Sequence, residues 1–148
     1  MAERTLTAMR RVAAVRAAQR VLAERALQAA TGAVAAADDA LAGAGERVED
    51  AFATWRAQAD AACFLPEIER HHAAQLIART GEQDAARTDR AQAETTLTGA
   101  RQGLRRADAA VEQGERIVRR LARRDRMRRE ERQLADHADR VTQRWGKQ

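Results

Sequence analysis

The sequence predicts an all-α fold, a long antiparallel coiled-coil hairpin made of two helices. Three observations predict it: two stretches of heptad-spaced apolar residues, an alanine-rich composition, and a single proline among 148 residues. The chain is 45% hydrophobic but only 3% aromatic, and alanine supplies most of the hydrophobic residues. Such a chain cannot fill a thick core, but its helices can meet along a thin seam.

The first apolar seam runs from Leu27 to Trp55. Every seventh residue in this stretch is large and apolar, and an alanine follows three residues after each of the first four. The large residues are Leu27, Val34, Leu41, Val48 and Trp55, and the alanines are Ala30, Ala37, Ala44 and Ala51. This is coiled-coil spacing with one large and one small core position per heptad.

The second seam has the same design and suggests a pairing with the first. Its members are Leu97, Leu104, Val111 and Val118, each followed three residues later by Ala100, Ala107, Gly114 and Leu121. Antiparallel helices whose paired residue numbers sum to 148 place a large residue against a small one in nearly every layer. The predicted hairpin core is Leu27, Val34, Leu41, Val48, Leu97, Leu104, Val111 and Val118.

A competing register has its turn at Pro66. It is displaced by two heptads and places Arg79, Gln83 and Arg90 in core layers. Because desolvating these groups costs more than the added apolar contacts return, the first register is preferred.

The elements follow in order from this choice. The first helix is expected over about 4–63, capped by Thr5 or Thr7, and it ends before Pro66 because proline disfavours helix in the residue preceding it. The tip is expected at about 64–82, with a short helix after Pro66 and a break around Gly81. If Gly81 instead lies within one unbroken return helix, the register is wrong and the turn is at Pro66.

The return helix is expected over about 83–144 and becomes very basic in its second half. Val141 and Trp145 are predicted to close the hairpin against Leu6. The basic run consists of Arg116, Arg119, Arg120, Arg123, Arg124, Arg126, Arg128, Arg129 and Arg132. The few acidic residues at helical spacing relieve its self-repulsion only in part, so an acidic partner is expected nearby.

Charge is distributed unevenly along the chain, whose net charge is +5. Residues 1–30 carry a net charge of +4, residues 31–62 carry −4, residues 63–100 carry −2 and residues 101–148 carry +7. A hairpin therefore brings both basic ends of the chain together and leaves its other end acidic.

The sequence gives no indication of catalysis. It has no glycine-rich phosphate loop. Adjacent residues on a helix point about 100° apart, so His71 and His72 are not expected to bind a metal together with Cys63. We predict a non-enzymatic protein without metal or cofactor. One cysteine, no run of eighteen apolar residues and no signal-peptide core in Met1 to Thr7 favour a soluble cytoplasmic protein.

Nucleic acid is the first alternative partner, since the arginine run would bind phosphate with strong salt dependence. The run is interleaved with acids and contains no aromatic residue for base stacking, so nucleic acid is not the expected partner. A general coiled-coil adaptor that dimerises in parallel is the second alternative.

Three sequence stretches resemble one known family. They are Leu6-x-x-Met9-Arg10-Arg11-Val12 and the Ala-Glu pair that follows it at Ala23-Glu24, then Phe52-x-x-Trp55-Arg56, and finally Ile117-Val118-Arg119-Arg120. They are similar to the opening helix, an aromatic cluster and the final helix of the FliJ/YscO (SctO) family, the coiled-coil stalk proteins of flagellar and virulence type III secretion. The chain differs from the family's usual richness in Lys, Glu and Gln.

The resemblance implies a cytoplasmic stalk between the export ATPase hexamer and the cytoplasmic domain of the export gate, associated with the inner-membrane secretion apparatus through this complex. Secretion chaperones are a further class of partner in the family. The candidate ATPase-binding residues are Arg10, Arg11, Arg119, Arg120, Arg123 and Arg124. The candidate contacts for the export gate or a chaperone are Phe52, Trp55, Arg56 and Phe64.

Overall fold

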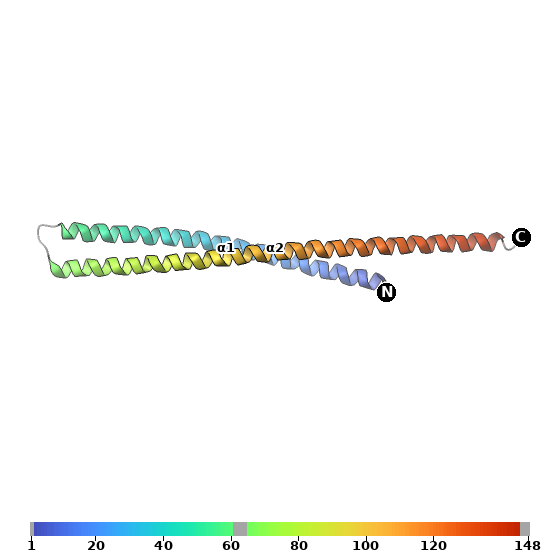
Figure 1. Cartoon of the computed structure of the whole chain (residues 1–148), viewed down its shortest axis with the longest axis horizontal. Helices are drawn as coiled ribbons and strands as arrows, with labels where there is room; N and C mark the ends of the chain where they lie inside the picture. Colours follow the sequence, from blue (N-terminus) through green and yellow to red (C-terminus); the bar gives the residue numbers. More distant parts are fainter. Residues whose placement is uncertain (1, 61–64, 146–148) are drawn as a thin grey trace. The chain divides into compact units, whose positions relative to one another are not determined.

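The computed structural model describes residues 2–60 and 65–145, and in that part of the chain it contains two long α-helices packed against each other and no strand (Figure 1). Helix α1 spans Ala2–Ala59, and helix α2 spans Pro66–Trp145. The prediction of an all-helical fold with two long helices is confirmed.

The start of α2 follows from its sequence. Pro66 occupies the first helical position, where proline's missing N–H is not needed, and Glu67 and Glu69 place negative charge in the first turn. The Leu65 carbonyl accepts hydrogen bonds from the N–H groups of Ile68 and Glu69, both at 3.1 Å. Helix α1 ends at Ala59, and Cys63, its expected end, lies outside the described residues.

The predicted tip at 64–82 is wrong, because α2 continues without a break from Pro66 through Gly81. A glycine inside a helix costs only about 1 kcal/mol relative to alanine. The exposed ion pair between Arg79 and Glu82, one turn apart at 2.9 Å, offsets part of that cost. One glycine among good helix formers therefore does not end the helix.

The chain divides into two units, each with one segment from either helix. The terminal unit contains residues 1–23 and 104–148, and the central unit contains residues 24–103.

Within each unit, the contacts between α1 and α2 define the pairing of residues. The two helix segments run in opposite directions, so residue numbers rise along one and fall along the other. For each contacting pair, the two residue numbers add up to between 126 and 130. The predicted sum of 148 is therefore wrong. The contacts are Arg16 with Ala110 and Gly114, Arg20 with Asp108, Asp38 with Arg90, and Arg47 with Glu82.

Two of the polar residues that counted against the competing register, Arg79 and Arg90, remain close to water in the observed pairing. The Arg90 side chain is 39% exposed and pairs with Asp38 and, at 3.0 Å, with Glu94. The hydrogen bond to Asp38 raises the pKa of Arg90 above its ordinary value, and the charges of Asp38 and Glu94 act in the same direction. In a two-helix pair a long side chain lays its stem along the seam and keeps its charge in solvent. The expected desolvation cost is therefore avoided.

The core is thin, as the alanine content predicts. The buried hydrophobic residues among those described are Leu6, Ala30 and Ala44, which are 7%, 5% and 2% exposed. The other seam residues are half-buried: Leu27, Val34, Leu41, Val48, Leu97, Leu104, Val111 and Val118.

The expected closure of the hairpin by Val141 and Trp145 is also wrong. Val141 is 41% exposed and Trp145 is 75% exposed, whereas Leu6 is buried. In the observed register Leu6 is level with Leu121, which is half-buried, so α2 extends well past the residues that face the start of α1.

We predict that Gly81→Ala stabilises the protein by up to about 1 kcal/mol, because a helical glycine is replaced and nothing lies within 4 Å of the new Cβ. Thermal unfolding followed by circular dichroism measures the change. Gly45→Ala is the comparison, since its Cβ would lie 3.4 Å from Gln83 Nε2 and gain less. An unchanged melting temperature for Gly81→Ala would favour a loop at this position.

The register is tested by cross-linking in a Cys63→Ser background. We expect a short bis-maleimide to join the Gly45→Cys/Gln83→Cys pair within one chain, because Gly45 and Gln83 face each other across the central unit. The Gly45→Cys/Gly103→Cys pair, which the sum of 148 brings together, should remain unlinked. Mass spectrometry of the monomer distinguishes the two, and the opposite pattern would restore the predicted register.

Candidate basic binding surface

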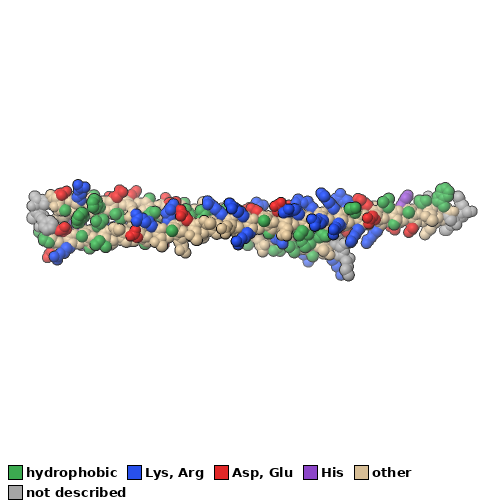
Figure 2. Space-filling view, in the orientation of Figure 1, with side chains coloured by type: hydrophobic (Ala, Val, Ile, Leu, Met, Phe, Trp, Pro, Cys, Tyr) green, Lys and Arg blue, Asp and Glu red, His purple; other side chains and the backbone are tan. Residues whose placement is uncertain are grey.

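The two units differ in charge. The terminal unit has 19 basic and 9 acidic side chains, a net charge of +10, whereas the central unit has 8 basic and 13 acidic, a net charge of −5. Figure 2 shows basic side chains gathered on the terminal unit's part of α2. The sequence predicted this segregation, because each basic end of the chain belongs to the same unit.

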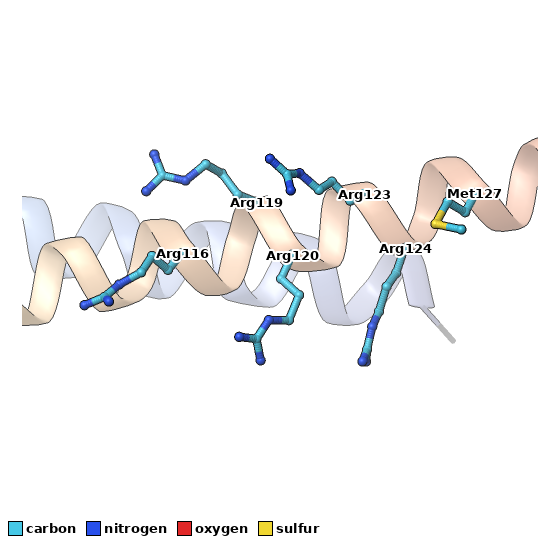
Figure 3. A pocket seen from close by; sticks show the side chains of 6 residues that line it. All are labelled: Arg116, Arg119, Arg120, Arg123, Arg124 and Met127. Carbon is cyan, nitrogen blue, oxygen red and sulfur yellow. The ribbon is translucent and has the colours of Figure 1, made fainter.

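The densest basic surface is on α2 and is drawn in Figure 3. Arg119 and Arg123 extend to one side of the helix and Arg120 and Arg124 to the other, with α1 behind them. Between the two rows lies a shallow depression of about 350 Å³. It is lined by Arg116, Arg119, Arg120, Arg123, Arg124 and Met127.

Only part of this positive charge is compensated. Arg116 pairs with Glu112 at 3.6 Å and Arg119 with Glu115 at 3.5 Å, both one turn apart along the helix. Such exposed pairs contribute about 0.3–0.5 kcal/mol each. Among the described residues, Arg120, Arg123 and Arg124 form no ion pair. Their exposed guanidinium groups are therefore available to bind carboxylates or phosphates.

The first turns of α1 add a second basic patch to the terminal unit. Arg10 and Arg11 are exposed, and Arg11 lines a shallow depression of about 380 Å³ together with Arg4, Thr7 and Ala8. Arg4 was not among the predicted site residues. In the observed register it is level with Arg123, which only a correct pairing of the helices would have revealed.

Arg16 and Arg20 hold α1 against α2. Arg16 Nη1 donates to the Ala110 carbonyl at 3.0 Å, and its stem lies over Gly114, where an added Cβ would be 3.5 Å from Arg16 Cδ. Arg20 Nε lies 2.7 Å from Asp108 Oδ1. Both arginines therefore connect the two helices.

The predicted aromatic site lies in the central unit. Phe52 is 45% exposed, and its ring centroid is 5.8 Å from that of Trp55. Trp55 is half-buried, and its Nε1 is buried without a hydrogen-bond partner in the described structure. Arg56 is exposed in the last turn of α1, and Phe64 lies outside the described residues. The exposed part of this cluster is a Phe and an Arg one turn apart.

Neither a metal centre nor a membrane span is found in the described part of the chain. Among those residues, no three His, Cys, Asp or Glu side chains are grouped so that they could bind a metal ion. No described helix is both long and apolar enough to cross a membrane.

Comparison with known proteins found no matching family model, no similar curated protein and no similar solved structure.

We predict that Arg16→Ala destabilises the protein by about 1–2 kcal/mol, because it removes a partly buried hydrogen bond and the contact of the stem with Gly114. Urea unfolding measures the change. Arg11→Ala, at an exposed position of the same helix, should change stability by less than about 0.5 kcal/mol. Equal effects of the two substitutions would contradict the structural role of Arg16.

Proposed function

We propose that the chain is a long antiparallel coiled-coil hairpin that acts as a non-enzymatic stalk in a type III secretion or flagellar export apparatus. Three features support the proposal: contacts between α1 and α2 in which residue numbers rise along one helix and fall along the other, a thin heptad seam, and stretches that resemble the FliJ/YscO family. In this role the protein is cytoplasmic and is associated with the inner-membrane apparatus through its complex.

The export ATPase hexamer is the proposed partner of the terminal unit. The observation that carries this proposal is the net charge of +10 on that unit, with arginines on α2 that have no ion-pair partner among the described residues. Exposed arginines of this kind suit a ring lined with carboxylates, and their field speeds association. The proposed ATPase contacts are Arg10, Arg11, Arg119, Arg120, Arg123 and Arg124.

The central unit is the proposed site for the cytoplasmic domain of the export gate, or for a secretion chaperone. Its exposed Phe52 and the neighbouring Arg56 offer an apolar and a charged contact next to the half-buried Trp55. Phe64 belongs to the same proposal on the basis of sequence alone. The net charge of −5 on this unit favours a partner surface that differs from the one the terminal unit binds.

Nucleic acid remains the competing partner, because the exposed arginines on α2 would also bind phosphate. That function predicts binding to duplex DNA or RNA that weakens steeply with added salt, and no effect on any ATPase. The two functions therefore differ in a measurement that can be made on one preparation.

We predict that changing Arg119, Arg120, Arg123 and Arg124 together to glutamate abolishes stimulation of the partner export ATPase. The reason is charge reversal on an exposed surface, so helicity measured by circular dichroism should persist. ATP hydrolysis measured at increasing stoichiometry should saturate near one wild-type copy per hexamer.

The control replaces the same four arginines with lysine, which preserves the charge and should retain most of the stimulation. Stimulation that survives the glutamate variant would refute the role given to these arginines. Absence of any binding to the ATPase at physiological salt would make nucleic acid the next partner to test.

A further inference from the structure

We infer that the terminal unit binds an acidic amphipathic helix of another protein, which lies along one face of α2 from Arg116 to Trp145. Of the residues on this face, the proposed function uses only Arg120, Arg123 and Arg124. The inference adds the second half of the face, an exposed apolar stripe, and specifies the chemistry of the partner.

The face is defined by helical geometry. Successive residues of an α-helix are 100° apart, so residues at spacings of three, four, seven and eleven share one side. The members of this face lie within about 60° of Met127 by this geometry. They are Arg116, Arg120, Arg123, Arg124, Met127, Glu130, Glu131, Leu134, Ala138, Val141, Thr142 and Trp145.

The face therefore has two halves in sequence order. Its first half is basic and includes most of the lining of the depression in Figure 3. Its second half is mainly apolar, with Met127, Leu134 and Val141 at heptad spacing and Trp145 four residues after Val141. We call this second half the apolar stripe.

The apolar stripe is exposed and is not covered by α1. Met127 is 59% exposed, Leu134 70% and Trp145 75%, and every described side chain from residue 126 to 145 is exposed. Helix α1 packs on the opposite side of α2, where Gly114 is buried and the Asp125 side chain is only 16% exposed. A helix of about 20 residues without a packing partner is marginal in water, so this segment gains from one.

Charge complementarity identifies the partner as acidic at one end. Arg120, Arg123 and Arg124 form no ion pair among the described residues, so glutamates of an incoming helix meet uncompensated charge. Apolar residues elsewhere on the same helix then meet the stripe. Such a helix contacts this face through residues three, four and seven apart.

A second copy of this chain fits less well. In parallel it would place arginines against arginines, and in a fully overlapped antiparallel pair it would place the basic half against the apolar stripe. Nucleic acid also fits less well, because a phosphate backbone makes no use of the heptad-spaced Met127, Leu134 and Val141.

The test uses the full chain and two synthetic fluorescent peptides of four heptads, each with apolar residues at the two core positions. One peptide has glutamates flanking the core in its N-terminal half, the other in its C-terminal half, so that both helix directions are sampled. A third peptide has lysines in place of glutamates. We expect fluorescence anisotropy to detect binding of one acidic peptide and none of the lysine peptide.

Substitutions then separate the two halves of the face. Leu134→Glu should weaken binding by roughly tenfold or more, whereas Gln133→Glu, its neighbour outside the face, should have little effect. Replacing Arg120, Arg123 and Arg124 by glutamine should weaken binding and reduce its salt dependence, and Arg132→Gln on the other side of the helix should not.

Three results would overturn the inference: no binding of either acidic peptide, binding that Leu134→Glu leaves unchanged, or preference for duplex DNA over both acidic peptides. Self-association that depends on Leu134 and excludes the peptides would likewise replace it with a dimer. The inference rests on the proposed function only in that both use the same three arginines. The peptide-binding assay contains no ATPase, so it tests the inference separately. Peptide binding without ATPase stimulation would therefore refute the proposed function alone.

Discussion

Close approach of two alanine-lined helix faces is the constraint on which the rest of this structure depends. Because a pair of helices has no third layer, most seam positions are only partly shielded from water, and the few buried side chains include Ala30 and Ala44. A seam this thin tolerates long polar side chains, whose charged ends reach solvent. Arg16, Arg20 and Arg90 use this freedom, and their contacts with α2 or with Asp38 help to define how the helices pair.

The same thinness explains which parts of the fold were predictable. Heptad spacing and composition predicted two long helices. Pro66 was correctly predicted to start a helix, but the break expected around Gly81 was wrong, so α2 begins at Pro66 and not near residue 83. The register was not predictable from the alternation of large and small residues, because that alternation repeats every heptad and satisfies several displaced pairings. Desolvation was the wrong criterion for choosing among them. It applies to Arg90 only if the side chain is enclosed, whereas 39% of it is exposed.

The functional surfaces were predictable to the extent that they depend on charge. Arginine clustering in the sequence identified the basic run, and α1 and α2 both contribute basic residues to the terminal unit. Arg4 and the apolar stripe were missed for a geometric reason. The stripe lies on the side of α2 opposite the seam, and it continues past the level at which α1 begins, near Arg123. Val141 and Trp145 were predicted to pack in the core because apolar residues at helical spacing were taken to belong to the seam.

Charge segregation between the units is stronger evidence for function than the abundance of arginine. An abundance of arginine spread evenly along the chain would not produce +10 in one unit and −5 in the other. Self-repulsion on this scale disfavours a compact state. The terminal unit nevertheless leaves Arg120, Arg123 and Arg124 without ion pairs among the described residues, although the acidic residues of the chain are sufficient to compensate them. An arrangement that forgoes internal compensation is stabilised when an acidic partner supplies it, and the apolar stripe that continues the same face gives that partner a site to pack against.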